Sequence, residues 1–327
     1  MCHNNSIYSD EKSSVLVDKT KSGKVRPWKE KKIANVDYFE LLHILEFKKA
    51  ERVKECAVIL EYKESRETGE RKLYKVWFCK SRLCPMCNWR RAMKHGIQSK
   101  KVVADVIRQK PTVRWLFLTL TVKNVYDGEE LNKSLSDMAQ GFRRMMQYKK
   151  INKNLVGFMR ATEVTVNNKD YSYNQHMHVL LCVESTYFKN TENYVTQKQW
   201  IQFWRKAMKL DYDPNVKVQI VNPKNEQKSD IQSAIDETAK YPVKDTDFMT
   251  DDEDKNLKRL SDLEEGLHRK RLISYGGLLK EIHKKLNIDD AEDGDLIHTD
   301  DDEKADEDSY SIIAMWNWER KNYFIKD

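Results

Sequence analysis

The sequence has no apolar run that approaches the roughly 20 residues a helix needs to span a bilayer, which predicts no membrane partner. The stretch from Met1 to Asp18 lacks the apolar core of a secretion signal, so we expect a cytoplasmic protein. No GxxxxGK[ST] loop is present, which argues against an ATPase or helicase of that class. No internal repeat is visible either.

Acidic residues are concentrated in one segment, and the rest of the chain is strongly basic. The net charge is +7, yet Asp289 to Asp308 contains twelve acidic residues and the single base Lys304, for a net charge of −11. The remaining residues therefore carry +18. A body with this charge favours a polyanionic partner, and nucleic acid is the first candidate. The alternative is a generic lysine-rich surface. The acidic segment is expected to be disordered.

Cysteines are few but clustered, and in a reducing compartment this pattern indicates metal ligands before disulfides. Cys79, Cys84 and Cys87 follow the spacing C-x4-C-x2-C, which predicts structural zinc. Zinc takes four ligands, and Cys56 at the start of a predicted hairpin is the favoured fourth. His95 is the alternative fourth ligand, and a set of reduced buried thiols is the alternative to a metal site. Cys182 is expected in the core and Cys2 in a solvated arm.

Hydrophobic periodicity predicts a chain that mixes helices and strands. Predicted strands cover residues 56–62, 73–78, 115–122, 157–166, 176–183 and 216–221. Predicted helices cover residues 38–53, 88–109, 131–150, 197–209, 229–241, 255–271 and 277–286. The segment 311–324 is apolar enough to pack back onto the body.

A candidate catalytic metal site begins with His176-Met177-His178. Alternate side chains of a strand point to the same face, so the two imidazoles can chelate one divalent ion while Met177 points into the core. Glu163 is the candidate third ligand, because a turn after Val166 would fold its strand beside the histidines. One carboxylate and two imidazoles leave coordination positions open for a phosphate oxygen and water. Two surface histidines are the alternative.

A candidate nucleophile lies in the segment from Glu237 to Lys244. Helical spacing places Glu237 and Tyr241 on one face. The phenolic oxygen of Tyr241 can attack phosphorus, while Lys240 or Lys244 stabilises the developing charge. Pro242 disfavours a helical conformation at the preceding residue, so the helix should end at the tyrosine. A surface tyrosine in a basic turn is the alternative.

The order of these motifs resembles that of the HUH endonucleases, in which two histidines flank a hydrophobic residue. More closely, the chain resembles replication initiators of Gram-positive rolling-circle plasmids, the group of pC194 and pUB110. The resemblance rests on the stretches CKSRLCPMCNWRRA, ATEVTVNN with YNQHMHVLLCVE, and ETAKYPVKDTDF. It extends from about Val53 to the C-terminal MWNWERKNY segment.

The resemblance implies an α+β fold, with a central antiparallel sheet of about five strands, flanking helices and a small zinc-binding hairpin module. Residues 1–35 are polar, charged and without periodicity, which predicts a flexible arm. A hairpin and zinc module with a basic helix is expected over 36–110, and an endonuclease core over 111–250. A C-terminal helical region over 251–327 would contain the acidic disordered stretch 289–308.

The resemblance also implies an activity: nicking of single-stranded or extruded origin DNA through a 5′-phosphotyrosine on Tyr241. Glu237 would then activate water for termination, and Lys244 completes the catalytic set. His176, His178 and Glu163 would hold Mg²⁺ or Mn²⁺. A host helicase and the host replication machinery would be partners.

Candidate DNA contacts are the basic side chains Arg82, Arg90, Arg91, Arg143, Arg144 and Lys240. The basic run from His268 to Arg271 could equally be a solvated face. Trp200 and Trp204 share a helix face, and we expect them in the core rather than stacked on bases. Two other interpretations stay open: a noncatalytic zinc-containing DNA-binding regulator, and a transposase or relaxase of the same superfamily.

Overall fold

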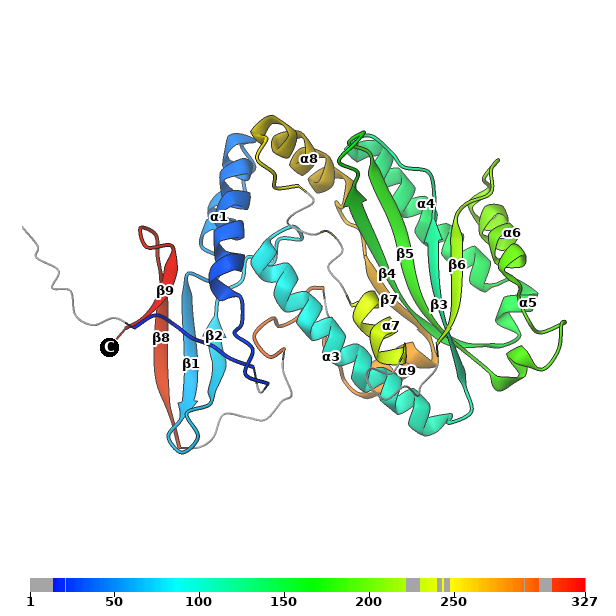
Figure 1. The fold of residues 1–327 in the computed structure, drawn as a ribbon, viewed down its shortest axis with the longest axis horizontal. Helices are drawn as coiled ribbons and strands as arrows, with labels where there is room; N and C mark the ends of the chain where they lie inside the picture. Colours follow the sequence, from blue (N-terminus) through cyan, green and yellow to red (C-terminus); the bar gives the residue numbers. More distant parts are fainter. Residues whose placement is uncertain are drawn as a thin grey trace, which may run out of the picture.

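A computed structural model of the chain describes residues 14–20, 22–221, 230–239, 243, 248–290, 292–299 and 308–326. Two antiparallel sheets lie on either side of the long helix α3, Pro85–Gln109 (Figure 1). The predicted α+β class is therefore confirmed, including the sheet of five strands. Among the residues described, no helix combines the length and apolarity needed to cross a membrane.

The five-stranded sheet has the strand order β6-β3-β5-β4-β7. Its strands are β3 (Arg114–Thr121), β4 (Leu155–Val166), β5 (Tyr173–Val183), β6 (Val216–Val221) and β7 (Ile273–Gly277). The central strands are rich in β-branched and aromatic residues, which favour a pleated, buried surface. Side-chain alternation gives the sheet two apolar faces, so each must be covered by helices.

Helices cover the two faces of this sheet differently. The front face packs against α3, α7 (Asp230–Thr238) and α9 (Leu278–Lys285) through a cluster that includes Trp115, Met159 and Leu180. The back face packs against α4 (Gly128–Met146) and α6 (Gln197–Met208) through Leu118, Met177 and Val179. Short connections include α5 (Lys149–Asn152) and η1 (Ser185–Phe188).

The second sheet has the order β2-β1-β8-β9 and joins distant parts of the sequence. Its strands are β1 (Ile59–Ser65), β2 (Arg71–Val76), β8 (Ser309–Asn317) and β9 (Asn322–Lys326). Helices α1 (Trp28–Ile44), α2 (Ala50–Lys54) and α8 (Glu253–Gly266) complete this half of the molecule. The predicted packing of 311–324 onto the body takes the form of β8 and β9, which extend the N-terminal hairpin.

The structure differs from the predicted domain boundaries in three places. Helix α1 begins at Trp28, so the part of the proposed arm from there to residue 35 is folded. The region 251–327 supplies β7 to the core sheet and β8 and β9 to the other sheet, in addition to its helices. The stretch 292–299, expected to be disordered, packs against α3, because Lys94 binds Asp289 and the Asp295 carbonyl while Leu296 is buried.

The core of the back face contains the two tryptophans of α6. Trp200 and Trp204 are both fully buried, and the indole N–H of Trp204 donates to the carbonyl of Thr121 at 2.8 Å. This contact holds α6 against the end of β3. The expectation that these residues belong to the core rather than to a base-stacking platform agrees with their burial.

We predict that Trp204→Ala lowers the free energy of unfolding by about 3–5 kcal/mol, because a buried indole and its hydrogen bond are lost. The matched control Trp77→Ala removes a half-exposed tryptophan and should change the free energy of unfolding by no more than about 0.5 kcal/mol. Denaturant unfolding of both variants measures the difference. Equal destabilisation would contradict the assignment of Trp204 to the core.

Candidate metal centres and active site

The pairing of three strands brings the predicted catalytic ligands together on the front face. Glu163 on β4 lies directly opposite His176 on β5, and His178 follows on the same face. The Nε2 atoms of His176 and His178 lie 3.4 and 3.2 Å from the same atom, Oε2 of Glu163. Their ligand atoms all lie within 4.8 Å of one another, so the group could hold one metal ion.

Further side chains orient the histidines, and the sequence analysis did not include them. Nδ1 of His176 lies 3.0 Å from Oδ1 of Asn174, and Nδ1 of His178 lies 3.4 Å from Oγ1 of Thr119. Phe117 stacks on the His178 ring. Contacts at Nδ1 leave each Nε2 free to face Glu163, which is how outer residues orient metal-ligating imidazoles. Asn174 could have been found from the sequence, because it is on the same strand parity as the histidines.

The electrostatics of Glu163 favour an ionised ligand. Burial alone raises the pKa of this carboxyl, but hydrogen bonds and charge interactions with His176 and His178 outweigh it and lower the pKa well below the usual range. The carboxylate is therefore available at neutral pH. Ligands about 2.1 Å from an octahedral ion stand about 3.0 Å apart, close to the distances found here. The residues present therefore fit a divalent ion.

Helix α7 crosses the front face and adds a second carboxylate to this centre. Oε1 of Glu237 lies 3.8 Å from Nε2 of His178, and about a third of its side chain is exposed. The predicted base thus stands beside the predicted metal ligands and retains access to solvent. Tyr241, Lys244 and Lys240 lie outside the described residues.

The four predicted thiols of the second cluster also converge. Cys56, Cys79, Cys84 and Cys87 are buried, and three of their Sγ–Sγ distances are 3.6, 3.6 and 3.7 Å. These distances are too long for disulfides. A tetrahedral ion with metal–sulfur bonds of about 2.3 Å holds its ligands about 3.8 Å apart. The cluster therefore fits a tetrahedral metal ion.

The local fold explains how this cluster forms. Cys84 is the N-cap of α3 and Pro85 occupies its first turn, so Cys87 lies one helical turn away. The backbone N–H groups of Cys79 and Ser81 donate to the sulfurs of Cys56 and Cys79. Such donors favour the thiolate form that metals bind.

Lys32 supplies a buried positive charge beside the thiols. Its side chain is fully buried, and Nζ donates to Oδ1 of Asn35 and to the carbonyls of Lys54 and Cys56 at 2.7–2.8 Å. Burial lowers the pKa of Lys32 to about 8, while the neighbouring cysteines act to raise it. None of its three partners is an anion. A metal held by four thiolates carries a net negative charge, which is the counter-charge that a buried ammonium needs.

His95, the alternative fourth ligand, is not part of this cluster. It is fully buried on α3, and neither ring nitrogen has a hydrogen-bond partner among the described residues. Burial lowers its pKa to about 4, so the ring is neutral. Cys182 is also separate and lies in the front-face core.

The predicted DNA-binding arginines divide into distinct environments. Arg90 and Arg91 are buried, and their guanidiniums donate to backbone carbonyls that include those of Leu296 and Glu292. Their side chains hold the segment 292–299 on α3 and present no free surface to a phosphate. Arg82 is paired with Glu292 at 3.2 Å.

The other two arginines are on α4, behind the sheet. Arg144 donates to the carbonyl of Ala207 at 2.8 Å, whereas Arg143 is exposed. Both lie on the face of the five-stranded sheet opposite the one that carries His176 and His178.

Comparison with known proteins gives a family that agrees with this site. A family model described as "Replication protein" matches residues 70–324, which is more than half of the chain. The chain belongs to this replication protein family. The resemblance to rolling-circle replication initiators inferred from the motifs is thereby confirmed at the level of the family.

The matches to individual relatives span all or nearly all of the length of those proteins. A "Replication protein" of Staphylococcus aureus is 91% identical over 235 residues, which are 72% of this chain and all of that protein. A "Protein rep" of Lactiplantibacillus plantarum is 48% identical over 318 residues, 96% of this chain and 99% of that protein. A "Protein rep" of Streptococcus pneumoniae is 41% identical over 321 residues, 97% and 98% of the two chains. No solved structure matches.

We predict that Cys56→Ser releases the metal of the four-cysteine cluster and lowers the melting temperature, because a tetrahedral site with three thiolates binds far more weakly. Cys182→Ser is the matched control, since that thiol is equally buried but outside the cluster. Elemental analysis of the purified chains gives the result, and zinc is the metal expected. Unchanged metal content in Cys56→Ser would remove this cysteine from the ligand set.

Proposed function

We propose that this chain initiates DNA replication by nicking one strand at an origin, with Tyr241 as the nucleophile. The observation that carries the proposal is the convergence of Glu163, His176 and His178 with Glu237 of α7. Tyr241 follows Glu237 by four residues in the sequence. The order of these groups and the membership of the replication protein family support the same activity.

The carboxylate and the two imidazoles would hold Mg²⁺ or Mn²⁺, which accept oxygen and nitrogen ligands with positions left open. Such an ion supplies polarisation of a phosphate oxygen and orients the scissile phosphodiester. Asn174 and Thr119 act through the histidines, because they fix which ring nitrogen faces the site. The four-cysteine cluster is proposed to hold structural zinc and takes no part in the reaction.

In the nicking step, the phenolic oxygen of Tyr241 attacks phosphorus. The new bond joins that oxygen to phosphorus, and the bond from phosphorus to the 3′ oxygen breaks. The products are a 5′-phosphotyrosine and a 3′-hydroxyl that can prime synthesis. Lys244 and Lys240 are assigned to stabilising the charge that develops on the phosphate.

Glu237 is proposed to act in termination. A water molecule attacks the phosphotyrosine, Glu237 accepts its proton, and the tyrosine oxygen leaves. The partial exposure of Glu237 and its distance of 3.8 Å from His178 suit a base that meets water beside the reacting phosphate. Unwinding of origin DNA is left to a host helicase, because the sequence lacks a GxxxxGK[ST] loop.

We predict that Glu163→Gln weakens Mn²⁺ binding by at least about 100-fold, since it removes the ligand that faces both imidazoles. The control Glu184→Gln makes the same chemical change just after β5, at a carboxylate paired with Lys110. It should bind Mn²⁺ with the affinity of the native chain. Calorimetric titration of the zinc-loaded proteins measures both affinities. Native affinity in Glu163→Gln would refute the ligand assignment.

We predict that Tyr241→Phe forms no covalent adduct with single-stranded origin oligonucleotides in the presence of Mn²⁺, because the nucleophilic oxygen is gone. Glu237→Ala should form the adduct but release the DNA slowly, and Tyr126→Phe, which alters an exposed tyrosine, should behave as the native chain does. Denaturing gels resolve all four proteins. An adduct in Tyr241→Phe would exclude this nucleophile. No adduct with the native chain, despite DNA binding, would favour a noncatalytic regulator.

A further inference from the structure

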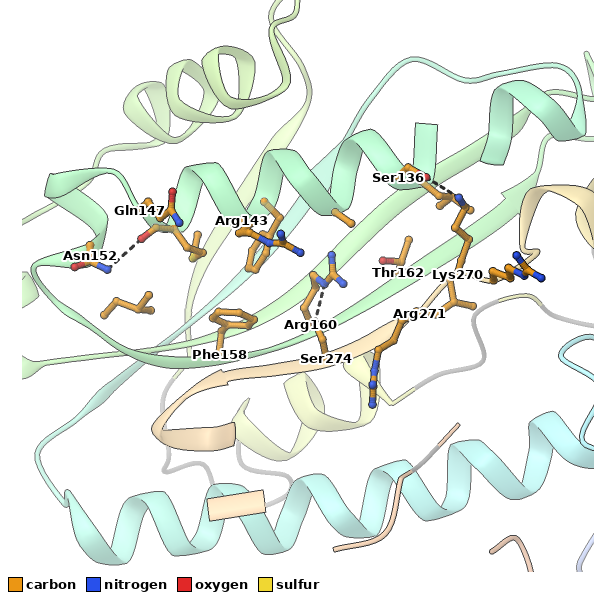
Figure 2. Close-up of a pocket in the computed structure, with 17 residues that line it drawn as sticks. Ser136, Arg143, Gln147, Asn152, Phe158, Arg160, Thr162, Lys270, Arg271 and Ser274 are labelled. Carbon is orange, nitrogen blue, oxygen red and sulfur yellow. Dashed lines mark hydrogen bonds between the residues drawn. The ribbon is translucent and has the colours of Figure 1, made fainter. Parts of the chain in front are cut away.

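A cavity of about 580 Å³ lies behind the sheet, on the face opposite the histidines. Helix α4 forms one wall, β4 the floor, and the loop of residues 269–272 with β7 the other wall (Figure 2). Phe158, Arg160 and Thr162 line it, and they have the opposite strand parity to Glu163. It exists because α4 and α6 pack over β6, β3 and β5 and leave the back of β4 and β7 partly uncovered.

The charges around this cavity are one-sided. Five of its seventeen lining residues are cationic, and none is acidic. The cations are Arg143, Arg160, Arg269, Lys270 and Arg271. Arg271 turns away and pairs with Asp290, and the nearby carboxylate of Glu292 accepts from the N–H groups of Leu272 and Ile273. The cavity therefore keeps an excess of positive charge that an anionic ligand would neutralise.

Arg160 is the least expected member of this group. Only 6% of it is exposed, and its guanidinium donates to Oγ of Ser274 at 3.1 Å and approaches the Met177 sulfur. No carboxylate pairs with it among the described residues. Burial lowers the pKa of Arg160 to about 10, and the neighbouring Arg143 acts in the same direction while Glu292 opposes it. A buried guanidinium without an anion is costly, so this position favours a bound one.

Arg143 and Lys270 line the same cavity as Arg160. Figure 2 shows the guanidiniums of Arg143 and Arg160 approaching each other from α4 and β4. Arg143 has no hydrogen bond or ion pair with any described residue. Lys270 donates to Oγ of Ser136 across the cavity at 2.6 Å. The two guanidiniums of Arg143 and Arg160, neither of which forms an ion pair with a described residue, favour a phosphate between them.

Seven of the other twelve lining residues are apolar, and two of these are aromatic. Phe142 and Phe158 meet edge to face at 4.9 Å, and the Arg160 guanidinium lies 5.5 Å from the Phe142 ring. A ligand that satisfies this lining has a charged end and a flat apolar part. A nucleotide has both, and 580 Å³ suits a group of that size.

We infer that this cavity binds one nucleotide unit of single-stranded DNA, with the phosphate held by Arg143, Arg160 and Lys270 and the base against Phe158. The preference for an anionic ligand follows from the charges of the cavity alone, whereas the assignment of that ligand to a DNA strand rests on the proposed function. Because Arg160 is only 6% exposed, a flexible single strand suits this site better than a rigid duplex does. The site would hold the strand behind the sheet while the other face performs the nicking.

The test measures binding of a fluorescent oligothymidylate of about six nucleotides, without added Mn²⁺, in the Glu163→Gln background. Arg143→Ala and Arg160→Met should each weaken binding about tenfold. Each should also reduce the slope of log affinity against log salt by about 0.7, the value for one lost phosphate contact on a single strand. Lys198→Ala removes an exposed charge from α6 on the same face and should change affinity less than twofold.

Competition distinguishes the sources of phosphate. A longer oligothymidylate should displace the probe best, thymidine monophosphate less well and inorganic phosphate least. A monophosphate that competes as well as the strand would contradict the strand assignment. Native affinity and salt slope in Arg143→Ala, whose exposed side chain can be removed without unfolding the chain, would overturn the inference. Because this assay measures binding and not nicking, its result does not depend on the test with Tyr241→Phe. Failure of this inference and failure of the proposed function can therefore be told apart.

Discussion

The candidate active site depends on the register between β4 and β5. Glu163 pairs with His176, so its carboxylate and both imidazoles lie side by side on one face. A slip of one residue would turn Glu163 to the back face, because strand side chains alternate. Pairing of Thr119 with His178 on the third strand fixes the other side of the centre. The same alternation sends Phe158 and Arg160 to the back, so one register creates both the candidate metal centre and the basic cavity.

The four-cysteine cluster is the equivalent constraint for the other half of the molecule. It joins the loop before β1, the segment after β2 and the first turn of α3, with Lys32 of α1 beneath it. β8 then adds the C-terminal strands to β1, and Oη of Tyr323 on β9 donates to the Ala57 carbonyl beside Cys56. The loops that carry the four cysteines therefore position α3, the helix against which α7 and α9 pack. Loss of the cluster is expected to disturb both sheets.

Local rules predicted the residues that converge in the two candidate metal sites and missed the long-range contacts. The shared face of His176 and His178 follows from strand alternation, and Glu163 from the short turn between β4 and β5. Lys32 could not be predicted, because the apolar residues of α1 form no single stripe and its two carbonyl partners, Lys54 and Cys56, are more than twenty residues away. Strand β7 has two glycines and forms because β4 offers it a free edge. The order of residues 292–299 depends on basic partners of α3, which composition alone does not reveal. Tyr241, Lys240 and Lys244 remain predictions from the sequence.

Anomalous X-ray scattering from crystals of the full chain grown with Mn²⁺, with data collected at the zinc and manganese edges, tests the two metal sites most directly. Two separate peaks are expected. Zinc should lie among the sulfurs of Cys56, Cys79, Cys84 and Cys87, and manganese between Nε2 of His176, Nε2 of His178 and Glu163. A manganese peak elsewhere, or none at saturating Mn²⁺, would contradict the claim that this strand register builds a catalytic metal centre.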